Sequence, residues 1–217
     1  MRRALFAGSA LVLIAGFIIA SSYYKRTQTE KYSFMAQENA TTFIRDYSQT
    51  LGDDDAKVFL VEFMDPACET CAAFSPFVKK MMDANPGRIK LVLRYAPFHD
   101  GADYFVKILE AARKQEKYWE TLDIMYQSQP AWASHHNPQP QRIWQFLPQA
   151  GLDMEQLRQD MNDPEIARMI EQDLADARTL DVRKTPGFFV NGKPLQLFGY
   201  NELQELVQAE VRANYSD

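Results

Sequence analysis

The feature that most constrains this chain is residues 58–76, where an apolar run leads within four residues to Cys68-Glu-Thr-Cys71. The run predicts a strand, and the apolar spacing after Cys71 predicts a helix. Both thiols therefore stand at the start of a helix, where unpaired backbone N–H groups carry partial positive charge and stabilise a thiolate. This placement predicts redox chemistry, with Cys68 as the outer nucleophile and Cys71 as the resolving thiol one turn further along.

Cys68 and Cys71 are the only cysteines among the 217 residues, so none is left for a structural bridge and packing must stabilise the fold. The formal net charge is -5, although the first 26 residues carry four basic and no acidic side chains. The remainder is therefore strongly acidic. We expect no nucleic-acid partner, because phosphate binding requires a basic surface.

Residues 4–24 contain no charged side chain and are mostly apolar. A helix needs about 20 such residues to cross a bilayer, and Tyr23-Tyr24 before Lys25-Arg26 suits a membrane interface. We therefore expect a transmembrane signal-anchor that exports the body of the protein. Arg2-Arg3 before a short apolar run also fits a cleaved secretory signal, and the sequence leaves that alternative open.

Glu62 is the one charged residue in the strand predicted at residues 58–64. A central strand is covered on both faces, so a carboxylate there is costly to bury without a partner or a function. Because Glu62 precedes Cys68 by only six positions, it can lie beneath the thiols and relay a proton to or from Cys71. An edge position or a salt bridge is the alternative.

The rest of the chain predicts a strand at residues 88–95, parallel to the first through a right-handed crossover, and a block of helices at residues 100–180. A short strand then follows Thr185-Pro186, and Asn191-Gly192 predicts a hairpin turn into a partner strand at residues 195–198. An amphipathic helix from Asn201 ends the pattern.

These elements, in this order, resemble the thioredoxin superfamily, specifically its DsbA-like branch, over about residues 47–215. Residues 48–71 resemble the family's opening signature, which includes Gly52, Ala56, Val61-Glu62-Phe63, Asp65 and the Cys-x-x-Cys pair. Glu62 matches the family's buried acid, and Pro76 matches its helix-kinking proline. Thr185-Pro186 resembles the cis-proline loop, and residues 111–119 resemble a segment of the inserted helical domain.

The resemblance implies an α/β thioredoxin fold with an inserted all-helical domain, preceded by a single N-terminal transmembrane helix. The implied organisation is an anchor or signal at 1–24, a stalk and lead-in helix at 25–50, the first half of the thioredoxin fold at 51–98, the inserted helical domain at 99–180, and the second half of the fold at 181–217.

The resemblance also implies an exported thiol:disulfide oxidoreductase that acts on cysteine-containing client proteins, with disulfide formation as the expected direction. Thr185 and Pro186 would contact an extended client beside Cys68, and no cofactor is expected beyond the Cys68–Cys71 disulfide. We expect a membrane protein as the redox partner that recharges it. The implied location is a bacterial inner membrane with the catalytic domain in the periplasm, or the periplasm itself after signal cleavage.

The dipeptide Glu69-Thr70 departs from the Pro-His of the best-known oxidants of this branch. A negative charge beside Cys68 should raise the pKa of that thiol and weaken the oxidant. We therefore expect a redox potential more reducing than that of the strong family oxidants.

Three other functions stay open from the sequence. The Glu-Thr dipeptide is compatible with a disulfide reductase or isomerase. The helical block is compatible with a chaperone-like holdase. The thiols could also bind a metal, with Cu(I) favoured over zinc because soft sulfur ligands select it. The available histidines are His99, His135 and His136, and the last two are adjacent, which is poor spacing for one tetrahedral ion. We expect no metal site.

Overall fold

We analysed a computed structural model, which describes residues 14–17, 19–20, 23, 40–133 and 138–215. Within this part of the chain, five strands form one mixed sheet in the order β1-β3-β2-β4-β5. The strands are β1 (Gln49–Gly52), β2 (Val58–Met64), β3 (Ile89–Tyr95), β4 (Gly187–Val190) and β5 (Lys193–Pro194). The helices are α2 (Ala40–Phe43), α3 (Glu69–Asp83), α4 (Ala102–Arg113), α5 (Tyr118–Trp132), α6 (Pro140–Ile143), the 3-10 helix η2 (Leu147–Ala150), α7 (Met154–Asp160), α8 (Pro164–Thr179) and α9 (Tyr200–Asn214).

The strands predicted at residues 58–64 and 88–95 are confirmed as β2 and β3, and they are parallel as expected. On the other side of β2, β4 runs antiparallel, so β2 is the central strand. Its side chains alternate between two apolar clusters: Leu60 and Met64 belong to the cluster that includes α3 and α9, while Val61 and Phe63 belong to the cluster that includes the end of α8. This double coverage explains the nearly continuous apolar run.

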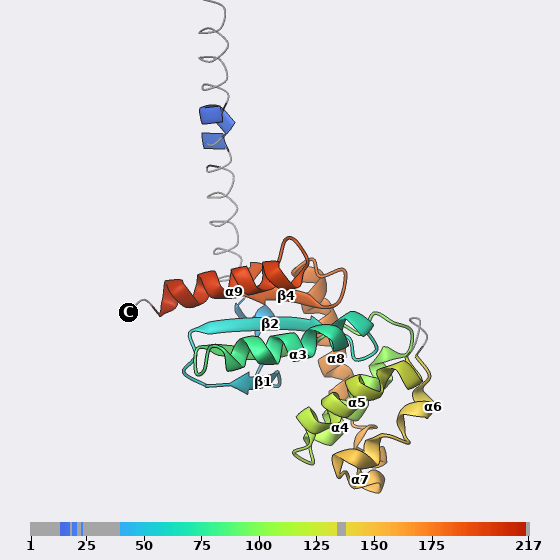
Figure 1. Cartoon of the computed structure of the whole chain (residues 1–217). Helices are drawn as coiled ribbons and strands as arrows, with labels where there is room; N and C mark the ends of the chain where they lie inside the picture. The colour runs from blue at the N-terminus through green and yellow to red at the C-terminus, as the bar shows by residue number, and fades with distance from the viewer. Residues whose placement is uncertain (1–13, 18, 21–22, 24–39, 134–137, 216–217) are drawn as a thin grey trace, which may run out of the picture.

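The helices α4 to α8 lie between β3 and β4 in the sequence, and Figure 1 shows α4 to α7 gathered beyond one end of the sheet. Aspartates begin the last two of them: the Asp153 side chain accepts from two backbone N–H groups of α7, and Asp163 caps α8, whose first residue is Pro164. Helix α8 then returns the chain to β3. The structure is thus a thioredoxin fold with helices inserted into it.

Two short strands differ from the sequence prediction. Strand β1 was not predicted; it pairs antiparallel with β3, and the expected boundary between residues 50 and 51 falls inside it. The hairpin turn at Asn191-Gly192 is confirmed, with φ of 47° and 79° as a type I′ turn requires. Its partner strand is Lys193–Pro194, and the predicted location at residues 195–198 is wrong, because a two-residue turn places the pairing immediately after Gly192.

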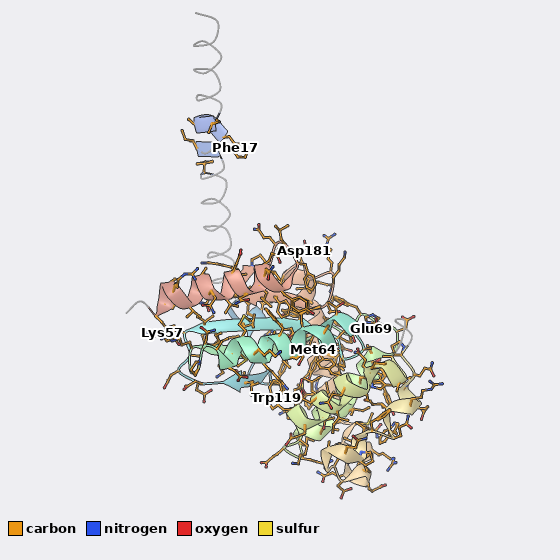
Figure 2. All side chains as sticks on the ribbon, viewed as in Figure 1. Phe17, Lys57, Met64, Glu69, Trp119 and Asp181 are labelled. Atoms are coloured by element: carbon orange, nitrogen blue, oxygen red, sulfur yellow. The ribbon has the colours of Figure 1, made fainter. Side chains whose placement is uncertain are left out.

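The described residues near the N-terminus are helical, and several of their apolar side chains are exposed, among them Phe17 at 75% (Figure 2). Within the described ranges, no helix is both long enough and apolar enough to span a membrane. Most of the anchor predicted at residues 1–24 lies outside those ranges, and so do residues 25–39 of the stalk and lead-in helix predicted at 25–50.

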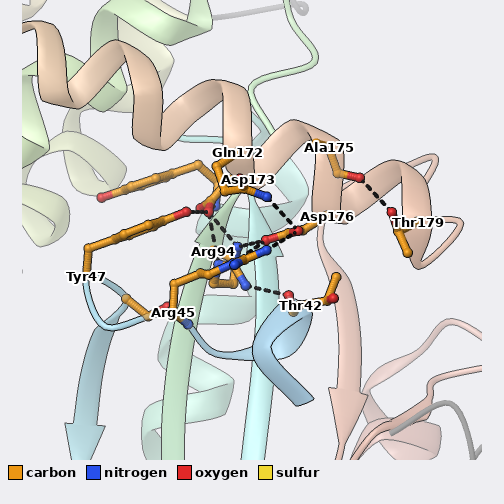
Figure 3. A network of polar contacts seen from close by, with 11 residues as sticks. Thr42, Arg45, Tyr47, Arg94, Gln172, Asp173, Ala175, Asp176 and Thr179 are labelled. Carbon is orange, nitrogen blue, oxygen red and sulfur yellow. Dashed lines mark hydrogen bonds and ion pairs between the residues drawn. The ribbon is translucent and has the colours of Figure 1, made fainter. Parts of the chain in front are cut away.

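A buried polar cluster connects three segments that are distant in sequence (Figure 3). Arg94 of β3 is fully buried and donates to the carboxylates of Asp173 and Asp176 on α8, each at 2.6 Å. Arg45 and Tyr47, which precede β1, also donate to these two carboxylates. The cluster therefore holds the last inserted helix and the lead-in segment against the same strand.

We predict that Asp173→Ala destabilises the protein by about 3–5 kcal/mol, because it leaves the Arg94 guanidinium buried with part of its charge uncompensated. Urea unfolding of both proteins measures this difference. Asp54→Ala is the matched control, since it removes the exposed partner of Lys90, and its midpoint should stay near that of the wild type. A loss below about 1 kcal/mol for Asp173→Ala would show that the cluster does not stabilise the fold.

Candidate active site

The two thiols lie at the N-terminus of α3, as predicted. Cys68 is the N-cap residue of this helix, with extended backbone angles, and Cys71 lies within the first turn. In Figure 2, Met64 and Glu69 mark the end of β2 and the start of α3, between which the active-site turn lies. Cys68 keeps 4% of its surface exposed and Cys71 none, and the two are not disulfide-bonded in this structure. Cys68 is therefore the sulfur that another molecule can reach.

The Thr185-Pro186 loop lies directly against Cys68. The Cys68 thiol donates a hydrogen bond to the carbonyl oxygen of Thr185 at 3.3 Å, and the Thr185–Pro186 peptide bond is cis. The loop reaches this position because β4, which begins at Gly187, pairs with the end of β2 immediately before the active-site turn. Sheet pairing thus brings the ends of two distant sequence motifs together.

The surroundings of Cys68 favour its ionised form. A hydrogen bond from Cys71, followed by one from the Thr185 side chain and the backbone N–H groups of Cys71 and Thr70, lowers the pKa of Cys68 from 9.0 to about 5, against the opposing effect of burial. The neutral thiol makes no capping hydrogen bond to α3. Cys68 nevertheless lies at the end of α3 where unpaired backbone N–H groups favour a thiolate.

The net pKa of Cys68 lies below the ordinary value of a cysteine even though Glu69 follows it in the sequence. Glu69 lies in the first turn of α3, but the contributions that determine the pKa of Cys68 come from Cys71, Thr185 and Thr70. The expectation that Glu69-Thr70 raises the pKa of Cys68 relative to the Pro-His oxidants, and so weakens the oxidant, stays a prediction, because the low net pKa comes from other groups.

Cys71 behaves in the opposite way. Burial, followed by its hydrogen bond to Cys68 and the negative charges of Glu62 and Cys68, raises the pKa of Cys71 well above 9.0. Two thiols one helical turn apart therefore differ strongly in acidity, because only the outer one is stabilised as an anion. At neutral pH the outer sulfur is a thiolate and the inner sulfur holds a proton.

Glu62 lies on the central strand with 4% of its surface exposed, which confirms its buried position and excludes the edge alternative. By strand alternation it points to the α3 side, like Leu60 and Met64. Burial, followed by the charge of Cys68, raises the pKa of Glu62 to about 8. At neutral pH it is therefore a protonated acid near the cysteines.

A small cavity adjoins Glu62. Its volume is about 10 Å³, close to the least that holds one water molecule, and its lining includes Ser75, Lys79 and Tyr126. The same three residues also line an open pocket of about 310 Å³ between α3 and α5. The cavity next to the buried acid and the open pocket therefore share part of their walls.

Two further polar residues at the site were not predicted to act there. The fully buried Asp65 carboxylate accepts from the backbone N–H groups of Ala67 and His99, and its Oδ2 lies 2.8 Å from Nδ1 of His99. The sequence interpretation used Asp65 only as part of a motif and His99 only as a possible metal ligand. Their pairing depends on the loop between β3 and α4 passing beside the end of β2, and no local pattern encodes that.

A groove of about 450 Å³ runs beside the reactive sulfur. It extends from Thr70 along the Thr185-Pro186 loop to Phe198, and its lining residues come mainly from the loop before β4. Phe198 of its lining is 55% exposed, and the preceding residue, Leu197, is 73% exposed. The groove therefore offers an extended, partly apolar surface next to Cys68.

The metal interpretation gains no support from this geometry. In the described part of the chain, no three His, Cys, Asp or Glu side chains are grouped so that they could hold a metal ion. His135 and His136 lie outside the described residues.

A central parallel pair, a dithiol at a helix N-terminus and an adjoining X-Pro loop define the thioredoxin fold class. A family model described as thioredoxin matches residues 45–209, which is well over half of the chain, and the protein belongs to that family.

Individual relatives agree with this assignment. The chain is 28% identical to a probable disulfide bond formation protein D of Bacillus anthracis, over 76% of this chain and 78% of the relative. A crystal structure of a thioredoxin-like oxidoreductase from Silicibacter pomeroyi superposes with a TM-score of 0.69 at 29% identity, covering 82% of this chain and 99% of that one. The predicted resemblance to DsbA-like thioredoxin-fold oxidoreductases is thereby confirmed.

Another curated relative is longer. A Na(+)/H(+) antiporter NhaA of Herminiimonas arsenicoxydans is 29% identical over 67% of this chain, but the match spans only 22% of the antiporter. The shared part is therefore about a fifth of that relative.

We predict that the ultraviolet absorbance of the thiolate titrates in the reduced protein with a midpoint near pH 5, the pKa of Cys68. Cys68→Ser should abolish this transition, because the pKa of Cys71 lies far higher. A midpoint near 9, the ordinary value for a cysteine, would contradict the proposed role of the α3 N-terminus.

We also predict that Glu62→Gln stabilises the reduced protein increasingly as pH rises from 4.5 to about 8. Over that window the folded carboxyl keeps its proton while the unfolded one has lost it, so Glu62 lowers the free energy of unfolding by about 1.4 kcal/mol per pH unit. Urea unfolding at several pH values measures the difference between variant and wild type. A difference that is constant with pH would show that the Glu62 pKa is not raised.

Proposed function

We propose that the protein is a thiol:disulfide oxidoreductase that exchanges disulfides with client proteins through Cys68 and Cys71. The observation that carries the proposal is the contrast between the two sulfurs: one is partly accessible with a pKa of about 5, and the other is enclosed with a raised pKa. A structural pair would need no such asymmetry, whereas exchange requires one good attacking or leaving sulfur and one protected sulfur.

In the oxidising direction, a client thiolate attacks Cys68 of the Cys68–Cys71 disulfide. A bond forms between the client sulfur and Cys68, the bond to Cys71 breaks, and the electron pair leaves on Cys71. A second client thiolate then attacks the client sulfur of this mixed disulfide, and Cys68 leaves as a thiolate. The client loses two electrons and the active site gains them. The low pKa of Cys68 makes it the better leaving group in this second step.

Glu62 supplies the proton that the first step needs. Because the pKa of Cys71 is raised, its departing thiolate takes up a proton, and Glu62 holds one at neutral pH. The small cavity lined by Ser75 and Tyr126 allows the acid to be reprotonated from solvent without opening the core. We therefore assign Glu62 the role of proton donor and acceptor for Cys71.

The groove beside Cys68 is the proposed client site. Thr185 and Pro186 form its wall next to the sulfur, so the backbone at Thr185 can pair with an extended client segment, while Leu197 and Phe198 offer apolar contact. Thr70 borders the same groove from α3, which gives the second residue between the cysteines a place in client contact.

We propose disulfide formation as the direction. A stabilised thiolate favours the reduced form of the enzyme and so makes its disulfide an oxidant. A pKa of about 5 for Cys68 lies between roughly 7 for thioredoxin and roughly 3.5 for DsbA. The match to a probable disulfide bond formation protein D supports the same direction. Reduction or isomerisation is the alternative that the intermediate acidity leaves open.

We propose that the protein acts outside the cytoplasm, tethered to a bacterial inner membrane through residues 4–24 or released by cleavage there. Disulfide formation requires an oxidising compartment, and the apolar N-terminal run suits export. A redox partner in the membrane would reoxidise the dithiol. The catalytic cycle needs no cofactor besides the Cys68–Cys71 disulfide.

We predict that Cys71→Ser traps client proteins and the redox partner as mixed disulfides on Cys68, because Cys71 can no longer attack Cys68 and release the bound protein. Non-reducing electrophoresis of cells whose thiols have been acid-quenched and alkylated detects them, and a reductant should release them. Cys68→Ser is the matched control and should trap none. Absence of mixed disulfides with Cys71→Ser would argue against client exchange.

We further predict a reduction potential between about -270 mV, the value of thioredoxin, and about -120 mV, that of DsbA. Equilibration with glutathione redox buffers measures it. A value at or below that of thioredoxin would favour the reductase alternative, while a value equal to that of DsbA would contradict a weakened oxidant.

A further inference from the structure

The Asp65 carboxylate lies at the base of the active-site turn and is enclosed there. Its side chain is completely buried, and its oxygens accept from three donors: the backbone N–H groups of Ala67 and His99 at 2.8 and 2.9 Å, and the His99 ring at 2.8 Å. A buried carboxylate needs such donors, because an uncompensated charge is costly in the interior. His99 supplies two of the three.

Asp65 also contacts both active-site cysteines through its backbone. Its carbonyl oxygen accepts from the N–H of Cys68 at 3.0 Å, and its own N–H donates to the Cys71 sulfur, which lowers the pKa of Cys71. The position of Asp65 therefore determines how the turn presents the two sulfurs, and its carboxylate accepts from the N–H of Ala67, the residue next to Cys68.

We propose that His99 is a positioning residue that holds the Asp65 carboxylate in place and compensates its charge, and thereby sets the redox potential of the Cys68–Cys71 pair. This inference rests on the proposed disulfide exchange. It assigns a role to a residue from the loop between β3 and α4, outside the motifs that identify the family.

The charges of the oxidised and reduced states determine how loss of the His99 ring changes the redox potential. In the reference reaction, the Cys68–Cys71 disulfide takes two electrons from two glutathione thiols, which become glutathione disulfide, and the protein ends as a dithiol with Cys68 ionised. Without the His99 ring, the negative charge of Asp65 is less compensated and repels the Cys68 thiolate. The disulfide carries no charge and is little affected. Loss of the ring therefore shifts the equilibrium toward the disulfide and makes the protein more reducing.

The test compares His99→Leu, which removes the ring donor, with His99→Asn, whose amide nitrogen can occupy the place of Nδ1 and donate to Asp65. Equilibration with glutathione should show the constant for reduction falling about three- to tenfold in His99→Leu and returning toward the wild-type value in His99→Asn. The Cys68 titration midpoint should also rise in His99→Leu but not in His99→Asn.

Gln129→Leu is the matched control for simple loosening of the turn. The Gln129 side chain donates to the carbonyl oxygen of Pro66 at 3.0 Å, so it holds the same turn without touching the Asp65 carboxylate. We expect it to lower the unfolding midpoint while leaving the potential unchanged. An equal change of potential in Gln129→Leu and His99→Leu would overturn the proposal, as would a wild-type equilibrium constant in a folded His99→Leu protein.

Equilibration of the wild-type protein with glutathione tests the proposed function independently of the role of His99. A wild-type protein that does not equilibrate with glutathione refutes the proposed exchange itself. If the wild type equilibrates and His99→Leu matches it, the exchange stands and only the role of His99 is refuted.

Discussion

The hydrogen bonds that reach the sulfur of Cys68 at the N-terminus of α3, first from Cys71, then from Thr185 and the backbone of the first turn, are the interactions on which the site depends. Unpaired backbone N–H groups exist at the start of every helix, but here a cysteine occupies the N-cap position and those groups serve a thiolate. The effect is short-ranged, so the first turn must be held in place. Pairing of β2 with β4 places the Thr185-Pro186 loop on one side of it, and Asp65 holds the turn beneath it.

Burial raises the pKa of all three ionisable groups of the site, but the net pKa is raised at only two of them. It raises the pKa of Glu62 to about 8 and that of Cys71 well above 9.0, whereas at Cys68 the nearby donors overcome it and the pKa falls to about 5. A reactive outer thiolate, a protected inner thiol and a protonated acid therefore coexist at neutral pH. Exchange chemistry needs these three protonation states together, and a single enclosed core produces them.

The inserted helices contribute to the site through packing and hydrogen bonds. Gln129 of α5 holds the carbonyl of Pro66, and Tyr126 of the same helix closes the cavity next to Glu62. At the far end of the insertion, Asp173 and Asp176 of α8 bind Arg94 of β3. The inserted helices are therefore anchored to the sheet and form one side of the active site.

The sequence by itself determined the strand-helix context of Cys68 and Cys71, the central strand containing Glu62, and the hairpin at Asn191-Gly192, because each depends on a local pattern of apolar residues or on the backbone preference of one turn. Only the tertiary structure decided that Asp65 meets His99, that Arg94 is buried among carboxylates, and that donors around Cys68 lower its pKa to about 5. These outcomes depend on which distant segments pack together. Electrostatic effects fall off steeply with distance and exposure, so they are set by the packed neighbours of a residue more than by its neighbours in the chain.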